Sequence, residues 1–117
     1  MMKRLLALVL LSALFVRGVG LEEGFQSPPM NARPQTWWHW IDGNITRDGI
    51  TKDLEAMAKV GLGGATILDI TGPAPSGPVK TVSPEWFGLV QHAIVEARRL
   101  GLEISLHNCP GWSSSGG

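Results

Sequence analysis

"SPEWFGLVQHAIVEARRLGLEISLH", residues 83–107, carries the pattern of a helix that leads directly into a strand. Ser83 is a typical helix N-cap, and Pro84 suits the first helical position, where no backbone N–H donor is needed. Gly101 can end the helix in a left-handed conformation, and residues 102–107 then alternate apolar and polar side chains as a strand does. Four residues at helical spacing are expected to form the buried face of this helix: Phe87, Val90, Ile94 and Ala97.

A strand, a helix and a second strand precede this stretch. Residues 35–40, QTWWHW, form a short aromatic run that suits a strand. Thr46 is a fair N-cap for the helix that follows, and Gly61 stands where that helix should end. Residues 65–70, ATILDI, are rich in β-branched and apolar side chains and predict a second strand. The apolar face of the intervening helix is expected to comprise Ile50, Leu54, Met57 and Ala58.

The order strand–helix–strand–helix–strand predicts a parallel α/β sheet with right-handed crossovers. Three strands with two helices on one side leave the other sheet face uncovered, although parallel sheets are normally buried on both faces. In a closed (β/α)8 barrel the opposing strands cover that face, but such a barrel needs about 250 residues. We therefore expect residues 35–117 to form the first βαβαβ portion of a (β/α)8 TIM-barrel domain, truncated at the C-terminus, so that the barrel is incomplete in this chain.

The N-terminus predicts a cleaved secretory signal peptide over residues 1–20. Lys3 and Arg4 precede an apolar run over residues 5–16, which small residues follow. The run is shorter than the roughly 20 apolar residues of a membrane span, and an uncleaved anchor is the alternative. The pattern predicts a secreted or periplasmic protein that meets the membrane only transiently, through this peptide. Residues 21–34 contain three prolines without periodicity and are expected to form an extended lead-in.

Charge and cysteine content exclude some classes of function. The chain has 10 basic and 10 acidic side chains, and removal of residues 1–20 would leave a net charge of −3. Because no basic run remains, nucleic acid is not expected as a partner. Cys109 is the only cysteine, so the chain cannot form an internal disulfide. No metal motif of recognised spacing and no P-loop occurs, and the sequence leaves the metal ligands unknown.

Three polar residues stand at or near the carboxyl ends of the predicted strands, where α/β proteins build their sites: His39, Asp69 and His107. Period-2 alternation predicts that all three point into one cavity, away from the helices. In the second strand, the positions expected to face the helices are Thr66, Leu68 and Ile70. A lone strand histidine is more often a hydrogen-bonded core or rim residue than a ligand, and we favour that interpretation for His39. Asp69 and His107 fit a structural and a functional role equally.

Tryptophan and amide side chains point to carbohydrate as the ligand. Flat indole faces stack on the apolar C–H patches of sugar rings, and Trp40 and Trp112 stand at a strand end or in a loop. The tryptophans expected in the core are Trp37, Trp38 and Trp86. Asn44 begins the glycosylation sequon N-I-T, but it suits a loop cap or a ligand equally well.

Three longer stretches together resemble the start of the glycoside hydrolase family 106 α-L-rhamnosidases. They are WWHWIDGNITRDGITKDLEAM at 37–57, GLGGATILDI at 61–70, and GPVKTVSPEWFGLVQHAIVEARRLGLEISLHNCPGWSSSGG at 77–117. The W-H-W…G-N-I-T and H-N-C-P-G-W-S-S-S-G-G blocks are the most distinctive. The resemblance covers nearly all of residues 25–117, and it matches only the N-terminal stretch of enzymes that are several times longer.

The resemblance implies an exported inverting glycosidase with a (β/α)8 catalytic domain that hydrolyses terminal α-L-rhamnose in polysaccharides. It also implies calcium, which takes part in substrate binding in that family. The residues that the resemblance makes candidates for substrate binding are Trp40, Asn44, Asp69, His107, Asn108 and Trp112, with Asp69 also a candidate metal ligand. An inverting glycosidase needs two carboxylates about 6.5–9.5 Å apart, and in the family these are glutamates beyond the region present here. We therefore assign no catalytic residue to this chain. Local glutamates that lie on predicted helices or at a strand start, and do not suit the role, are Glu55, Glu85, Glu96 and Glu103.

Two functions of other classes remain open. A small exported carbohydrate-binding protein without catalysis would use Trp40 and Trp112, and it requires the mature chain to fold by itself. A different α/β hydrolase would use Cys109 and His107 as a nucleophile–base pair, although no third helper residue is evident.

Overall fold

The computed structural model describes residues 20–108, 110 and 111, and its strands form one parallel sheet. The strands are β1 (Gln35–Ile41), β2 (Gly64–Ile70) and β3 (Glu103–Leu106), in the spatial order β1-β2-β3. Both neighbouring pairs are parallel, so the predicted strand order and pairing are confirmed. The predicted signal peptide, Cys109 and Trp112 lie outside the described residues, apart from Gly20 at the start.

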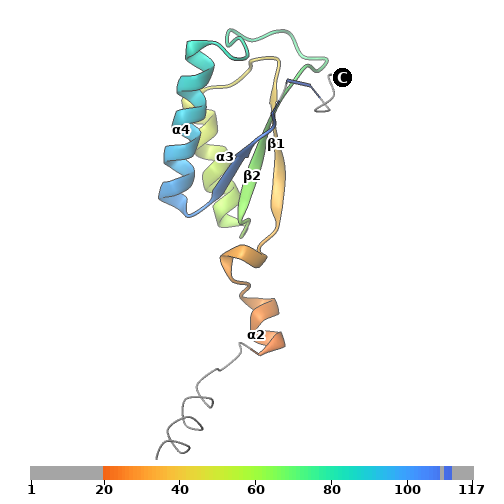
Figure 1. Ribbon diagram of the computed structural model, residues 1–117, viewed down its shortest axis with the longest axis vertical. Coiled ribbons are helices and arrows are strands. Elements are labelled where there is room, and N and C mark those ends of the chain that lie inside the picture. Colours follow the sequence, from red (N-terminus) through yellow and green to blue (C-terminus); the bar gives the residue numbers. More distant parts are fainter. Residues whose placement is uncertain (1–19, 109, 112–117) are drawn as a thin grey trace, which may run out of the picture.

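Two long helices connect the strands and lie on the same side of the sheet (Figure 1). Helix α3 (Arg47–Lys59) joins β1 to β2, and α4 (Pro84–Leu100) joins β2 to β3. The predicted caps are confirmed, because the Thr46 and Ser83 hydroxyls each accept a hydrogen bond at 3.1 Å from the backbone N–H three residues on. Gly101 ends α4 with a φ of 71°, the left-handed conformation that glycine adopts most easily.

The core lies between one sheet face and the two helices. Leu54 of α3 and Ile67 of β2 are fully buried, and the T-shaped contact between Trp38 and Trp40, with ring centroids 5.5 Å apart, adds two large aromatic groups. Burial of several large apolar side chains, at roughly 1.5–3 kcal/mol each, is the main force that holds the helices on the sheet. The predicted face of α3 is confirmed, with Ile50 and Leu54 buried in it.

The buried face of α4 differs from the prediction. Phe87 and Ile94, which were expected in the core, are 53% and 52% exposed. Helix α4 is apolar on several sides, so two overlapping faces satisfy helical spacing. The indole of Trp86 packs against that of Trp40, with ring centroids 6.1 Å apart, and the face of α4 that carries Trp86 is the buried one. The residues that α4 buries are Trp86, Leu89, Val90, Ala93 and Ala97.

The segment before β1 is not the extended lead-in that its prolines predicted. It contains a short helix, α2 (Leu21–Gln26), and a 3-10 turn, η1 (Met30–Ala32). Neither element buries a residue, and α2 extends away from the amino end of the sheet (Figure 1). Glu22 and Glu23 in the first turn of α2 favour a local helix at its positive end. Within residues 20–108, 110 and 111, no helix is long and apolar enough to cross a membrane.

Candidate functional site

The strand register divides the sheet into a helix-covered face and a second face, which we call the open face. Register partners in parallel strands point to the same side of the sheet. Trp38 pairs with Ile67, and both belong to the core beneath α3 and α4. Trp37 pairs with Thr66 and His39 with Leu68, which places these four residues on the open face. In the described part of the chain, no helix covers the open face (Figure 1).

Polar side chains link the three strands across the open face. The Nε2 of Gln35 on β1 donates a hydrogen bond to Glu103 Oε2 on β3 at 2.9 Å. The bond crosses Gly64 of β2, where an added Cβ would overlap the Glu103 carbonyl oxygen. One step further along, the Thr66 and Ser105 hydroxyls lie 2.8 Å apart. The open face is therefore polar at its amino end.

Both strand histidines lie on the open face near the carboxyl end. The backbone N–H of His107 donates to the Ile67 carbonyl at 3.0 Å, which continues the parallel ladder and sets His107 beside Leu68. His39 pairs with Leu68 from the other side and is solvent-exposed. The exposure of His39 fits a residue at the rim and not one in the core, and its alternation with Trp37 already placed it on the face of His107.

Trp37 is 66% exposed, so the prediction that it belongs to the core is wrong. Its ring lies edge-on to that of His39, with centroids 6.2 Å apart. The cause is its place in the strand, since Trp37 points to the open face while its neighbour Trp38 points to the helices. An exposed indole beside an imidazole provides both an apolar surface and polar nitrogen atoms.

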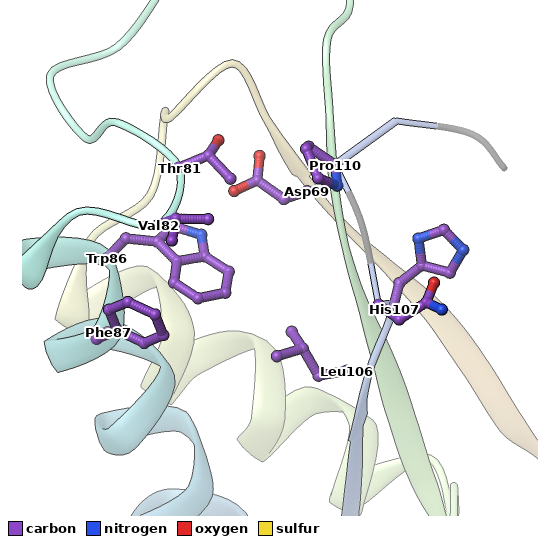
Figure 2. A pocket seen from close by; sticks show the side chains of 9 residues that line it. Asp69, Thr81, Val82, Trp86, Phe87, Leu106, His107 and Pro110 are labelled. Carbon is purple, nitrogen blue, oxygen red and sulfur yellow. The ribbon is translucent and has the colours of Figure 1, made fainter. Parts of the chain in front are cut away.

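Asp69 lies on the opposite side of the sheet from the two histidines. Its register partner is Trp40, on the helix-covered face. Figure 2 shows the Asp69 carboxylate directed toward Thr81 and the Trp86 side, while the imidazole of His107 points away from them. The prediction that His39, Asp69 and His107 point into one cavity is therefore wrong. Asp69 and His107 both line the cavity beside α4, with the His107 imidazole turned away from Asp69, and His39 lines a different cavity. Strand β2 is apolar on both faces, so alternation alone could not decide which face meets the helices.

Asp69 lines a cavity of about 230 Å³ between α4 and the end of β3 (Figure 2). Its other walls include Trp86, Phe87 and Leu106, and the exposed Asn108 lies at the same cavity. The Trp86 Nε1 is buried and has no hydrogen-bond partner among the described residues. The same is true of the Trp40 Nε1 in the core, so the unpaired indole nitrogen is not specific to this cavity.

Trp40 does not present an indole face to a ligand. It is only 2% exposed and packs between Trp38 and Trp86. The sequence placed Trp40 near a strand end, but its register position puts it under the helices, and the prediction that a sugar can reach it is wrong. Trp38 and Trp86 are core residues, as predicted. The sugar-stacking prediction for Trp112 falls outside the described residues.

Asn44 holds two loops together at the carboxyl end of the sheet. Its Nδ2 donates to the Ile41 carbonyl at 3.2 Å and to the Pro75 carbonyl at 2.9 Å. This nitrogen is the atom that N-glycosylation would modify, so the geometry favours the loop-cap interpretation over the sequon. Asn44 also lines a second cavity with His39, Ile41 and the loop residues Ala74, Pro75 and Ser76.

The ion pairs that join α3 to α4 lie away from the carboxyl edge. Arg99, near the end of α4, binds Glu96 at 2.7 Å and Glu55 of α3 at 2.8 Å. The hydrogen bond from Arg99 lowers the pKa of Glu96, and the same contacts raise the pKa of Arg99. These charges join α3 to α4 on the surface and do not prepare a carboxylate for catalysis.

The described residues do not fit a calcium site by themselves. Calcium takes about six to eight oxygen ligands. Among residues 20–108, 110 and 111, no group of three or more His, Cys, Asp or Glu side chains is placed to hold a metal ion. Asp69, the candidate metal ligand, faces the apolar cavity beside α4. The described side chains alone would therefore not hold a calcium ion.

Comparison with known proteins identifies the family. The model of the glycoside hydrolase family 106 α-L-rhamnosidases matches residues 26–117. The chain belongs to this family. The rhamnosidase of Novosphingobium sp. PP1Y has a similar structure, with a TM-score of 0.75 and 46% sequence identity. That match covers 84% of this chain and 10% of the Novosphingobium rhamnosidase.

A second similar protein is named for a different glycosidase activity. A protein of Formosa agariphila, named "Putative beta-glucuronidase", is 52% identical over 97 residues. The alignment covers 83% of this chain and 8% of the Formosa protein. The chain thus spans about a tenth of the length of the proteins it matches, and it corresponds to an N-terminal portion of a glycoside hydrolase of the rhamnosidase family.

Proposed function

We propose that this chain forms the first βαβαβ portion of a (β/α)8 catalytic domain in an exported glycosidase that hydrolyses terminal α-L-rhamnose from polysaccharides. The observation that carries the proposal is the rhamnosidase family match over residues 26–117. The substrate is a carbohydrate in this proposal, and the chain's share of the site is the open face at the carboxyl end of the strands.

Two exposed surfaces support the barrel part of the proposal. The open face has an exposed Trp37 and a polar ladder, and opposing strands of a barrel would cover it. On the helix side, the edge beyond α4 and β3 exposes Phe87, Ile94 and Leu106 next to the unpaired Trp86 Nε1. A further helix packed beside α4 would bury these apolar groups.

His39 and His107 are the residues that we propose for sugar recognition on the open face. Imidazole nitrogens donate or accept hydrogen bonds according to tautomer, and sugar hydroxyls do both. The two histidines flank Leu68 from the two sides of β2, so they can contact different hydroxyls of one ring. Asn108 follows His107 and is exposed, and its role in substrate binding stays a prediction, as does the role of Trp112.

We propose an inverting mechanism in which other parts of the enzyme supply the two carboxylates. Such a pair must lie about 6.5–9.5 Å apart around the sugar. Glu55 and Glu96 bind Arg99, and Glu103 binds Gln35 at the amino end of β3, far from the strand ends that carry the histidines. Any calcium in the active enzyme would likewise need ligands in addition to the described residues.

Export is proposed from the N-terminal sequence alone. Lys3 and Arg4 followed by an apolar run over 5–16 have the order of charged and hydrophobic regions in a signal peptide. Mass spectrometry of the protein recovered from the periplasm or medium should find a new N-terminus near residue 21. A product that keeps Met1 and stays with the membrane would contradict cleavage and favour the uncleaved anchor.

The function is tested by reading the coding sequence past Gly117 and assaying the product of the whole reading frame. We expect an open frame with glutamates at later strand ends, and hydrolysis of p-nitrophenyl α-L-rhamnopyranoside. NMR of the first anomer released should show inversion of configuration. A stop codon directly after Gly117 would contradict the glycosidase proposal, and sugar binding without catalysis would then be the function to test.

The name of the Formosa relative gives a second candidate substrate. The same preparation should be assayed with p-nitrophenyl β-D-glucuronide, because a protein 52% identical over 97 residues is named as a β-glucuronidase. Hydrolysis of the glucuronide without hydrolysis of the rhamnoside would replace the proposed substrate while leaving the glycosidase class intact.

A further inference from the structure

The long loop between β2 and α4 is fastened to the turn between β1 and α3. Residues 71–82 are rich in glycine and proline, a composition expected of a mobile loop. Yet the Gly77 N–H donates to the Asp42 carbonyl at 2.7 Å, and the Gly72 N–H donates to Asp42 Oδ2 at 2.9 Å. A single aspartate therefore holds the loop through both its backbone and its side chain.

Asn44 adds a third connection from the same turn. Its amide nitrogen bonds the Ile41 carbonyl on its own side and the Pro75 carbonyl on the other. Both hydrogen atoms of the amide are thus directed at backbone oxygens. Because one acceptor ends β1 and the other lies in the loop after β2, one side chain connects the two segments. We call the contacts of Asp42 and Asn44 with residues 72–77 the loop clasp.

Two glycines allow the loops to approach closely enough for the clasp. Gly43 has a φ of 70°, and a Cβ added to it would overlap the Val79 carbonyl oxygen. A Cβ on Gly77 would overlap the Gly43 carbonyl oxygen. The backbones of the two loops are therefore in direct contact, and a side chain at either position would push them apart.

We propose that Asn44 is a positioning residue that, together with Asp42, fixes the loop 72–77 as one wall of the sugar site. The cavity beside His39 is lined on its other side by Ala74, Pro75 and Ser76. These residues stay opposite His39 because the clasp holds their backbone. Asn44 acts through its amide nitrogen on the loop, not as a direct ligand. Only the description of this cavity as a sugar subsite rests on the proposed function.

The variant Asn44→Asp tests the clasp, since it keeps the shape of the side chain but loses both N–H donors. In the full chain, we expect amide hydrogen exchange at Gly77 and Gly72 to accelerate at least about tenfold, as a loop that opens locally does. The ring resonances of His39 should shift, whereas those of His92, which bonds Thr51 in the helix layer, should not.

Asn31→Asp is the matched control, because Asn31 is exposed in η1 and takes part in no side-chain hydrogen bond of the described chain. It should leave exchange at Gly72 and Gly77 unchanged. If Asn44→Asp fails to fold, Asn44→Ser provides the test, since the shorter, uncharged side chain cannot reach both carbonyls. Unchanged exchange at Gly72 and Gly77 in a folded Asn44 variant would overturn the clasp.

A titration with methyl α-L-rhamnoside separates the clasp from the proposed function. In the wild-type product of the whole reading frame the sugar should perturb His39 and Ser76, and Asn44→Asp should weaken this response. Weaker binding with unchanged loop exchange would make Asn44 a ligand and overturn the positioning role. Equal binding despite faster exchange would overturn it as well. If the wild-type chain shows no response, the sugar assignment fails, while exchange and the His39 shift still decide the clasp.

Discussion

The two faces of the sheet give neighbouring tryptophans of one strand opposite environments. Trp38 and Trp40 point to the helices and are 7% and 2% exposed. Trp37, the residue just before Trp38, lies on the open face and is 66% exposed. The helix-covered face is held by apolar burial, and the open face is linked by hydrogen bonds between side chains. The apolar core and the proposed sugar site therefore lie on opposite faces of the same three strands.

The largest expected contrast is between two tryptophans of β1. Trp40→Ala should lower the free energy of unfolding by about 3–5 kcal/mol, because it leaves a cavity between Trp38 and Trp86. Trp37→Ala, on the open face, should change it by only about 0.5 kcal/mol. Chemical denaturation of the 117-residue chain measures both changes in unfolding free energy. Equal losses would mean that the open face of this chain is packed as tightly as the core.

A glycine at the junction of the strands should give a smaller effect. Gly64→Ala places a methyl group against the Glu103 carbonyl and the Gln35–Glu103 bridge, and we expect a loss of about 1–3 kcal/mol in unfolding free energy. The matched control is Gly88→Ala in α4, where the nearest atom is 3.9 Å away. It should raise stability by about 0.5–1 kcal/mol, since alanine favours a helix. A tolerated Gly64→Ala would contradict the close approach of β2 and β3.

The hydroxyl pair on the open face should contribute less again. A double-mutant cycle with Thr66→Val and Ser105→Ala should give a coupling of about 0.5 kcal/mol, the range of cross-strand pairs. Denaturation of the four proteins supplies the coupling energy. A coupling of zero would show that solvent replaces this hydrogen bond at no cost.

The smallest effect should come from the surface ion pairs between α3 and α4. The hydrogen bond with Arg99 lowers the pKa of Glu96, so the pair stabilises the fold above the ordinary pKa of about 4.5. That stability should fade as pH falls through the lower pKa of the folded state. Thermal unfolding between about pH 5 and pH 3 should show a slightly steeper decline for the wild type than for Glu96→Gln. Parallel curves would mean that the pair contributes nothing, as many exposed ion pairs do.

Local signals in the sequence predict the three strands and the two long helices, including where those helices begin and end. Thr46 and Ser83 cap the helices as predicted, and Gly101 ends α4, because caps depend on one or two neighbouring residues. The strand order follows from helices long enough to be crossovers. By contrast, the six-residue helix α2 was missed, since no periodicity marks so short a segment.

Which face each side chain occupies could be predicted only where one side is polar. Strand β3 alternates clearly, so His107 was placed on the face opposite the helices, and the register agrees. Strand β2 is apolar on both sides, and Asp69 was therefore assigned to the wrong face. Helix α4 is ambiguous in the same way, and its spacing wrongly predicts that Phe87 is buried. The contact that decides the buried face joins Trp40 to Trp86, 46 positions apart, and local spacing cannot show it.

The central claim, that the open face carries the sugar site, is tested most directly by comparing variants of the two faces in the product of the full reading frame. With p-nitrophenyl α-L-rhamnopyranoside, His39→Ala and His107→Ala should each lower kcat/KM by about 100-fold, as loss of substrate-positioning contacts does. Asp69→Asn, on the helix-covered face, should stay within roughly threefold of the wild type. Loss of activity in a correctly folded Asp69→Asn, with both histidine variants active, would contradict the account.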